Sequence, residues 1–305
     1  MLLTLALACS SPAPQPTLPT TPTLKPVKVA LNWFAEPEFG GFYQAWLDGT
    51  YQAAGLAVEI VPGGPGVPVL EMLVNNKTDV AVSGAEDLLI RRAQGLKAVA
   101  VYPGFQDSPV GLLVHADGPA AFADVTGPVA IENGSAFQKY LWGKFLWEGK
   151  VPMVPTTGQL GPFAADPKLA QQGYITSEPC VAESMGLATR FLPGRDAGWN
   201  PYASLAVVRS EERTADWVVA FTKASKTGWE RYLADPAPAN KVITLQNPEM
   251  TPERLACIVD RQKPYVSGTD GVGAMTEARW AAIAAALVSI GEKVDATDAW
   301  VPPAP

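Results

Sequence analysis

The chain has 305 residues, of which 48% are hydrophobic and 17% are charged, so it has enough apolar side chains for two domains or one large one. Its net charge is −7, and no basic cluster exceeds the pair Arg91–Arg92, which argues against a nucleic-acid partner. One histidine and three cysteines without a Cys-x-x-Cys pair exclude a histidine-rich metal site, a zinc ribbon and an iron–sulfur cluster. We therefore expect no resident metal or cofactor.

Residues 1–26 are expected to be targeting sequence and tether rather than fold. A short apolar run ends at Cys9, and a proline-rich stretch follows it up to Pro26. The residues LALAC resemble a bacterial lipobox, in which the cysteine is lipidated, although Ala6 stands where the motif usually has Leu. We expect an exported lipoprotein, periplasmic or at the cell surface, whose only membrane attachment is a lipid on Cys9. A plain cleaved signal peptide and a disordered end are the alternatives.

From residue 27 onward, strand patterns and helix patterns alternate along the chain. Strands are expected at 27–33, 56–61, 79–83, 96–102, 108–115, 127–131, 173–176 and 202–209. Helices are expected at 40–54, 67–75, 85–94, 135–147, 214–234, 236–244, 252–262 and 276–290. This alternation is typical of an α/β fold with a largely parallel sheet.

The same pattern predicts two lobes that are discontinuous in sequence. Lobe 1 is expected to contain residues 27–106 and 206–305, and lobe 2 residues 112–198, with hinge crossovers at 107–111 and 199–205. Ligands of such folds lie at the carboxyl ends of strands, so the loops that directly follow strands are the candidate binding loops.

The loop after the first expected strand, Asn32–Tyr43, has an unusual composition. It combines aromatic rings, which offer stacking faces, with glutamates, which accept hydrogen bonds, and Gly40 allows the backbone to approach a ligand. The other interpretation is a hydrophobic lid on the core with solvated glutamates.

Several segments, taken together, carry a resemblance to a known family. The segment LNWFAEPEFGGFYQA closely resembles the opening motif of the NMT1/THI5-like, thiamine-precursor branch of ABC-transporter substrate-binding proteins. The similarity continues, in the expected order, through 78–95, 101–114, 165–179 and 200–209, and covers about residues 27–295.

The resemblance implies a type II periplasmic-binding-protein fold, whose two lobes close over a small solute. It further implies delivery to a membrane permease driven by an ATPase, without chemistry, and we expect a monomer. Carried over residue by residue, and joined by neighbouring residues in the same loops, the predicted ligand-binding set is Asn32, Trp33, Glu36, Glu38, Phe39, Gly40, Tyr43, Ser83, Gly84, Glu86, Tyr102, Gln106, Tyr174 and Glu178.

Two departures from the family pattern bear on the ligand. Thiamine-precursor members usually carry Pro-Asn after the tryptophan and a histidine before the glycine, where this chain has Ala35, Glu36 and Phe39. Without that histidine, the chemistry of the related eukaryotic pyrimidine synthase is not expected. The acidic strand-end loops favour an amino-substituted heterocycle such as a thiamine-precursor pyrimidine. A sulfonate, a nitrate or a flavin-like solute is the alternative, and an enzyme or a sensor domain on the same fold is the competing class.

Three further residue types have structural interpretations. Ser135 is expected to cap a helix rather than to bind an anion. His115 is expected at the surface. Cys180 and Cys257 fall in different expected lobes, so free thiols are favoured over a disulfide.

Overall fold

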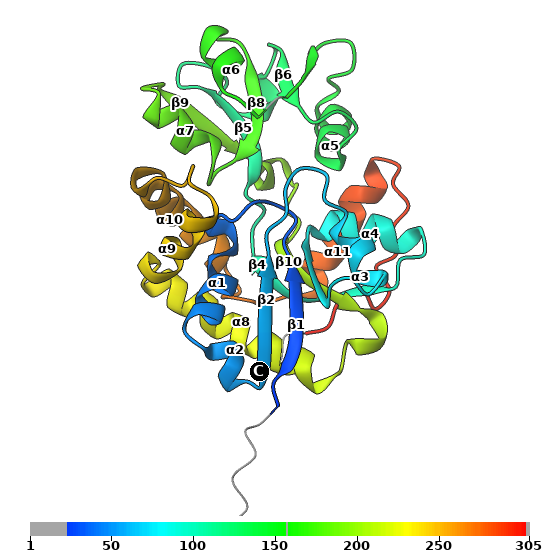
Figure 1. Cartoon of the computed structure of the whole chain (residues 1–305). Coiled ribbons are helices and arrows are strands. Elements are labelled where there is room, and N and C mark those ends of the chain that lie inside the picture. Colours follow the sequence, from blue (N-terminus) through cyan, green and yellow to red (C-terminus); the bar gives the residue numbers. More distant parts are fainter. Residues whose placement is uncertain (1–22, 157, 303–305) are drawn as a thin grey trace, which may run out of the picture.

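The computed structural model describes residues 23–156 and 158–302, whose strands form two five-stranded sheets with helices around them (Figure 1). The expected α/β fold of the two-lobed periplasmic-binding-protein type is confirmed. Cys9 and most of the expected tether lie outside the described residues. The first strand begins at Lys25, inside the segment expected to be tether, because residues 25–30 pair along their whole length with residues 56–61.

The first sheet has the strand order β2-β1-β3-β10-β4. Its strands are β1 (Lys25–Ala30), β2 (Leu56–Val61), β3 (Val80–Ser83), β4 (Ala98–Phe105) and β10 (Ala203–Arg209). Around it lie α1 (Gly40–Leu47), α2 (Thr50–Ala53), α3 (Val69–Val74), α4 (Ala85–Ala93), α8 (Asp216–Ala234), α9 (Ala237–Gln246), α10 (Pro252–Ser267) and α11 (Glu277–Ser289). The short helix η1 (Pro37–Phe39) leads into α1.

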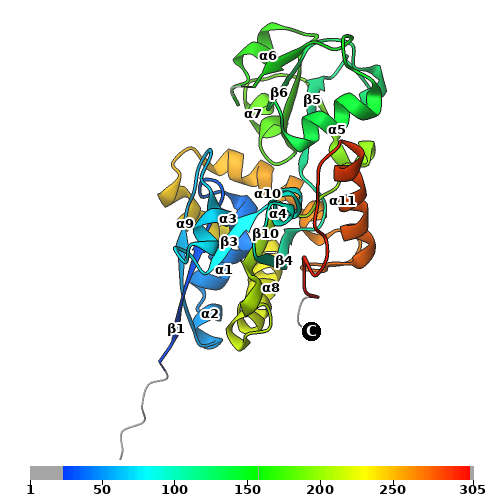
Figure 2. The same ribbon diagram turned by 90° about the vertical axis from the view of Figure 1, so that its right-hand side faces the viewer.

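The second sheet has the order β7-β6-β8-β5-β9 and forms the upper lobe in Figures 1 and 2. Its strands are β5 (Val110–His115), β6 (Val129–Ile131), β7 (Met153–Pro155), β8 (Ala170–Tyr174) and β9 (Thr189–Pro193). Its helices are α5 (Ala136–Phe145), α6 (Gly161–Ala165) and α7 (Glu178–Ser184). Both sheets are mixed rather than largely parallel, because β10 runs antiparallel to β3 and β4, and β5 runs antiparallel to β8 and β9.

The glycines at the start of α1 serve helix packing. A side chain at Gly40 would meet the ring of Tyr232, and one at Gly41 would meet the ring of Trp229, both on α8. On α8 itself, a side chain at Gly228 would meet the backbone oxygen of Gly41. The expectation that Gly40 lets the backbone approach a ligand is therefore replaced by a close contact between two helices.

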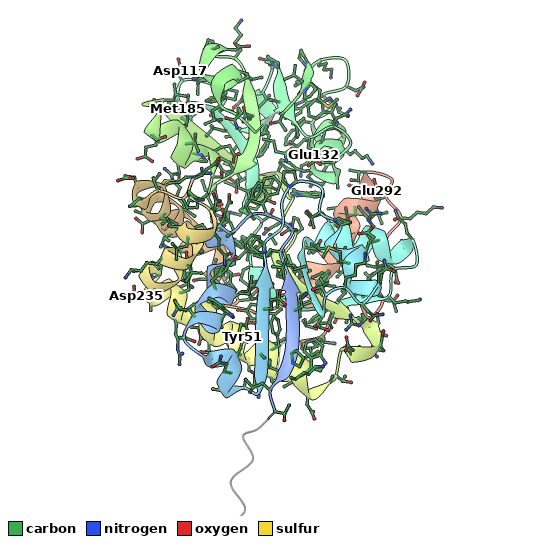
Figure 3. All side chains as sticks on the ribbon, in the orientation of Figure 1. Tyr51, Asp117, Glu132, Met185, Asp235 and Glu292 are labelled. Atoms are coloured by element: carbon green, nitrogen blue, oxygen red, sulfur yellow. A yellow bond between two sulfur atoms is a disulfide. The ribbon has the colours of Figure 1, made fainter. Side chains whose placement is uncertain are left out.

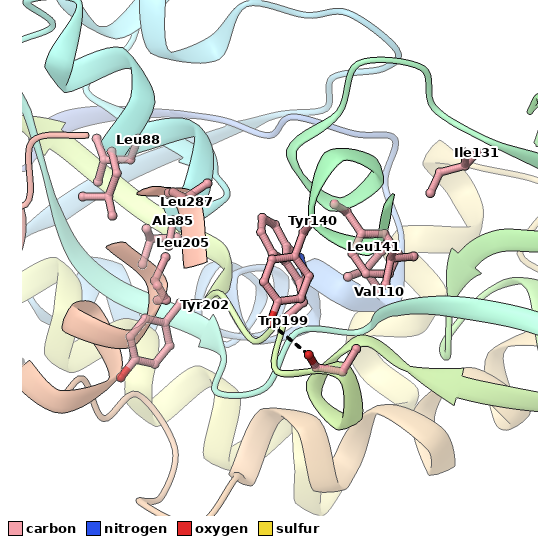
Figure 4. Close-up of a cluster of buried hydrophobic side chains, with 14 of the residues drawn as sticks. Ala85, Leu88, Val110, Ile131, Tyr140, Leu141, Trp199, Tyr202, Leu205 and Leu287 are labelled. Atoms are coloured by element: carbon pink, nitrogen blue, oxygen red, sulfur yellow. Dashed lines mark hydrogen bonds between the residues drawn. The ribbon is translucent and has the colours of Figure 1, made fainter. Parts of the chain in front are cut away.

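One hydrophobic cluster runs from lobe to lobe (Figure 4). It includes Leu205 of the first sheet and Leu287 of α11 together with Val110 of the second sheet and Tyr140 of α5. The Tyr140 hydroxyl donates to the carbonyl oxygen of Ala197 at 2.9 Å. Because burial of apolar area is the main stabilising term, this continuous cluster fixes α5 against α11.

The two crossovers between the sheets are held to each other by Asp107. Its carboxylate accepts hydrogen bonds from Arg195 Nη1 at 2.9 Å, from Asn200 Nδ2 at 2.7 Å and from Arg279 Nη2 at 3.3 Å. The Asn200 Oδ1 atom in turn accepts from the backbone N–H of Ser108 at 2.7 Å. The first crossover, the segment around the second crossover and α11 thus meet at the Asp107 carboxylate.

The expectation of free thiols was wrong, because Cys180 of α7 and Cys257 of α10 form a disulfide. The two positions are 77 residues apart in sequence, and only the packing of α7 against α10 brings them together.

The helix cap at Ser135 is confirmed, since its side chain accepts from the backbone N–H of Gln138. His115 is not a free surface residue, because its ring stacks on Phe163 at 4.2 Å. Across residues 23–156 and 158–302, no helix is both long enough and apolar enough to cross a membrane.

Candidate ligand-binding site

Two aromatic rings project from the loop that follows β1. Trp33 is 41% exposed and Phe34 is 45% exposed, and their rings meet edge to face with centroids 5.4 Å apart. The loop is anchored at its backbone, where the N–H of Gly63 donates to the carbonyl oxygen of Trp33 at 2.8 Å. Asn32 is exposed beside them. A fixed backbone with exposed rings provides a stacking face at the carboxyl end of β1.

The glutamates of the same loop lie deeper than the rings. Glu38 in η1 is only 6% exposed, and its Oε2 atom is buried without a hydrogen-bond partner among the described residues. Burial raises the pKa of Glu38. The nearby Thr176 hydroxyl and the Arg254 guanidinium act in the other direction and lower this pKa, but burial is the larger effect. Burial and the Glu38 charge raise the pKa of Glu36 to about 9, and Glu178 adds to this effect. The Glu36 carboxyl is therefore protonated at neutral pH, and burial shifts Glu38 in the same direction.

Lobe 2 contributes Glu178, at the start of α7, and Tyr174, at the end of β8. The Oε2 atom of Glu178 accepts from the backbone N–H of Tyr174 at 2.6 Å, and burial raises the pKa of Glu178 to about 7. The Tyr174 side chain is 42% exposed. Burial raises the pKa of Tyr174, and the carboxyls of Glu86 and Glu38 in lobe 1 add to the rise. Charges of lobe 1 thus act directly on a side chain of lobe 2.

The loop after β3 forms a second acidic border. The Ser83 hydroxyl is 3.4 Å from Asp87 Oδ2, and Gly84 leads into α4. The Glu86 carboxyl folds back toward Gly84, its Oε2 atom is buried without a partner in the described chain, and burial followed by the Asp87 charge raises its pKa to about 7.

Some predicted site residues lie in the core instead. Phe39 and Tyr43 belong to the core of lobe 1, and the Tyr43 hydroxyl donates to Gln246 Oε1 on α9 at 2.7 Å. Tyr102 is fully buried against Phe42, and Gly273 touches its ring. These aromatics complete the packing around α1, so the motif that contains them is in part a folding motif.

Gln106 lies at the first crossover, behind the cleft. It is 2% exposed, and its backbone N–H donates to Tyr265 O at 2.9 Å. Its Nε2 atom has no hydrogen-bond partner among the residues described here.

Two residues at the candidate site were not predicted from sequence: Thr176 and Arg254, which both act on the Glu38 carboxyl. Arg254 is near the start of α10; its Nη2 atom is 3.4 Å from Ser177 Oγ, and its buried Nε atom has no partner within the described chain. The buried Oε2 atom of Glu38 has no partner there either. Buried polar groups without partners cost free energy, so their grouping around Glu38 is what a site for a polar ligand requires. Helix α10 begins more than 200 residues after Glu38, so no local sequence signal places Arg254 beside Glu38.

Comparisons with known proteins identify the family and the fold. The family model described as NMT1/THI5 like matches residues 36–239. A search of curated proteins finds no match.

Solved structures similar to this chain share its architecture at low sequence identity. The periplasmic aliphatic sulphonate binding protein SsuA from Escherichia coli has a TM-score of 0.70 and 14% identity over 92% of this chain and 93% of that one. The alkanesulfonate-binding protein SsuA from Xanthomonas axonopodis pv. citri, bound to MOPS, has a TM-score of 0.65 and 15% identity over 90% of this chain and 98% of that one. The desulfurization enzyme DSZB has a TM-score of 0.59 and 14% identity over 90% of this chain and 96% of that one.

The raised pKa of Glu36 predicts a pH-dependent stability. A carboxyl whose folded pKa is about 9 rather than 4.5 costs the fold nothing below pH 4.5, and an increasing amount as the pH rises toward 9. We expect Glu36→Gln to raise the free energy of unfolding at pH 8 by about 1–3 kcal/mol, and to change it little at pH 4.5. Denaturant titrations at the two pH values measure this difference. The exposed Glu148→Gln serves as the control, and an equal effect of Glu36→Gln at both pH values would contradict the assignment.

Proposed function

Because the chain belongs to the NMT1/THI5-like family, we propose that it is the extracytoplasmic solute-binding component of an ABC importer. The family match, the two-lobed fold and the carboxyls that approach the gap from both lobes support this proposal. In this proposal the ligand lies between the lobes, and an ABC permease with its ATPase receives it.

We further propose that the solute is a small amino-substituted heterocycle such as a thiamine-precursor pyrimidine. The observation that carries this proposal is the set of buried glutamates with raised pKa values at the gap. A protonated carboxyl offers one O–H donor beside one C=O acceptor. An aminopyrimidine presents an amino N–H donor beside a ring-nitrogen acceptor, so the two edges pair through two hydrogen bonds. Trp33 and Tyr174 supply exposed rings for stacking.

Arg254 favours a second candidate, an anionic solute such as a sulfonate or a nitrate. Its guanidinium lies near Glu36, Glu38 and Glu178, yet it forms no ion pair with any described carboxylate. With Glu36 protonated, the site carries a cation beside an O–H donor, which suits an anion. Two of the similar structures are sulfonate-binding proteins. A flavin-like solute remains a further alternative for the same stacking face.

An enzymatic function is the weaker alternative, although one similar structure is a desulfurization enzyme. Cys180 and Cys257 are joined in a disulfide, so neither offers a thiolate nucleophile. Among the residues described by the structure, no group of three His, Cys, Asp or Glu side chains is placed to hold a metal ion. We therefore propose a binding protein without catalysis.

The proposed stacking role of Trp33 is tested by its removal. Trp33→Ala removes a ring contact worth about 0.5–1.5 kcal/mol beyond its buried area, so we expect the dissociation constant for an aminopyrimidine to rise about tenfold or more. Trp46 on α1 is also 41% exposed and lies outside the site, so Trp46→Ala is the matched control. Titration calorimetry measures both variants. Equal affinities of Trp33→Ala and wild type would remove Trp33 from the site.

Arg254 separates the two ligand classes. If the ligand is an anion, Arg254→Gln removes a charge-assisted hydrogen bond of about 1.5–3 kcal/mol, and sulfonate affinity falls at least tenfold. If the ligand is an aminopyrimidine, we expect the same variant to bind it within about threefold of wild type. Calorimetric titrations with taurine, nitrate and an aminopyrimidine distinguish the two ligand classes. The exposed Arg213→Gln is the control variant. Wild type that binds the anions and ignores the pyrimidine would overturn the proposed ligand class.

The proposed export as a lipoprotein depends on Cys9, outside the described residues. We expect metabolic labelling with a fatty acid to mark the protein, and Cys9→Ser to abolish the label and release the protein into the soluble fraction. Label that persists in the variant, or a soluble wild type, would contradict a lipid anchor at Cys9.

A further inference from the structure

The disulfide between Cys180 and Cys257 joins one lobe to the other. Cys180 lies in α7, which contacts β8 and β9 of the second sheet. Cys257 lies in α10, whose residues Leu255, Ile258 and Val266 are part of the core of lobe 1. The bond is therefore a third covalent connection between the lobes, in addition to the two crossovers.

Polar contacts surround this bond on the same side of the molecule. Arg261 Nη2 is 3.0 Å from Glu183 Oε2, which makes an ion pair between α10 and α7. Arg261 Nε also lies 3.1 Å from Cys257 Sγ. Figure 1 shows α7 directly above α10 on one side, whereas α5 and α11 meet on the other. On that other side, Lys139 Nζ and Glu292 Oε1 are 2.6 Å apart (Glu292 is labelled in Figure 3).

Helix α10 also reaches the crossovers, so its length gives the distance between the disulfide and the crossovers. The carbonyl oxygen of Tyr265 accepts from the backbone N–H groups of Gln106 and Asp107, and the Arg195 guanidinium stacks on the Tyr265 ring at 4.5 Å. Tyr265 and Cys257 are eight residues apart in one helix, a rise of about 12 Å. Along α10, the disulfide thus lies about 12 Å from the contact with the first crossover, about which we take the lobes to turn.

At this distance from the crossovers, the disulfide limits how far the lobes can separate. An opening of about 20° about the crossovers would move α7 from α10 by roughly 4 Å at that distance. The Cα atoms of Cys180 and Cys257 are 5.9 Å apart, and disulfide-linked Cα atoms rarely exceed about 6.8 Å. The bond therefore permits rotation of only a few degrees unless α7 or α10 deforms.

We propose that the Cys180–Cys257 disulfide is a strap that holds the lobes nearly closed, so that the cleft is preformed before a ligand arrives. Ligand exchange in the oxidised protein then uses small movements, and wide opening requires that the bond be broken. A preformed cleft loses less free energy on binding, because the closed state is already populated. The proposal draws on the proposed function only for an oxidising extracytoplasmic compartment, in which disulfides persist.

The test needs no ligand, so its failure is distinct from failure of the proposed function. Small-angle scattering compares the oxidised protein, the protein reduced with a phosphine, and the double variant Cys180→Ser/Cys257→Ser. The phosphine gives two electrons to the disulfide and becomes its oxide, and water supplies the oxygen and the protons of the two thiols. We expect the reduced protein and the double variant to show a radius of gyration larger by roughly 1 Å, against about 19 Å for a compact chain of 305 residues.

Three controls make the result decisive. The phosphine must not change the radius of the double variant, and circular dichroism must show that both forms keep their fold. Arg261→Gln breaks the adjacent ion pair but leaves the bond intact, and we expect it to keep the smaller radius. If the double variant does not fold, the reduced wild type provides the comparison. Equal radii for the oxidised and reduced protein, or peptide mapping that finds Cys180 and Cys257 unlinked after export, would overturn the proposal.

Discussion

The relative position of the lobes depends on the carboxylate of Asp107. Two arginines and an asparagine donate to it from the second crossover and from α11, so segments far apart in sequence share one charge. A partly buried carboxylate of this kind is stable only while its donors stay in place, because an unpaired charge there is costly. The crossovers therefore behave as one unit. Asp107 is thus one of the links between the lobes, beside the shared hydrophobic cluster and the disulfide.

The fold buries several carboxyls close together where Glu36, Glu38 and Glu178 meet, which costs free energy. Glu38 is buried without a hydrogen-bond partner for Oε2 among the described residues. Its charge lies close enough to Glu36 to raise the pKa of Glu36. Protonation lowers this cost, since a neutral carboxyl is far cheaper to bury than a carboxylate. The candidate site is thus a set of carboxyls with raised pKa values beside one arginine, Arg254. Such a set discriminates by hydrogen-bond pattern rather than by net charge alone, and a ligand that satisfies the unpartnered atoms removes the remaining penalty.

The sequence predicted what depends on local pattern, and missed what depends on packing. The strand at 56–61 and the helix beginning at 252 were predicted at those residues because alternation and proline at a helix start are local signals. Strand β7 was missed because its three residues, only partly buried, carry no periodicity. The loop after β1 was predicted as a binding loop; its exposed rings and buried glutamates are compatible with that prediction, which stays a prediction. Its Gly40 instead packs on α8, since a glycine pattern does not reveal which neighbour approaches it.

Helix α10 shows why the missed residues belong together. Arg254, Cys257, Arg261 and Tyr265 recur at intervals of three and four residues, so they share one face of the helix. In order along that face they contact Ser177, the partner cysteine, Glu183 and the crossover. The adjacent face, with Leu255, Val259 and Val266, packs in the core of lobe 1, and this apolar face is what periodicity detects. A polar face that serves another lobe looks like a solvated one in sequence. Its role appears only when the second lobe is in place, and then one helix contacts the candidate site, the proposed strap and the first crossover.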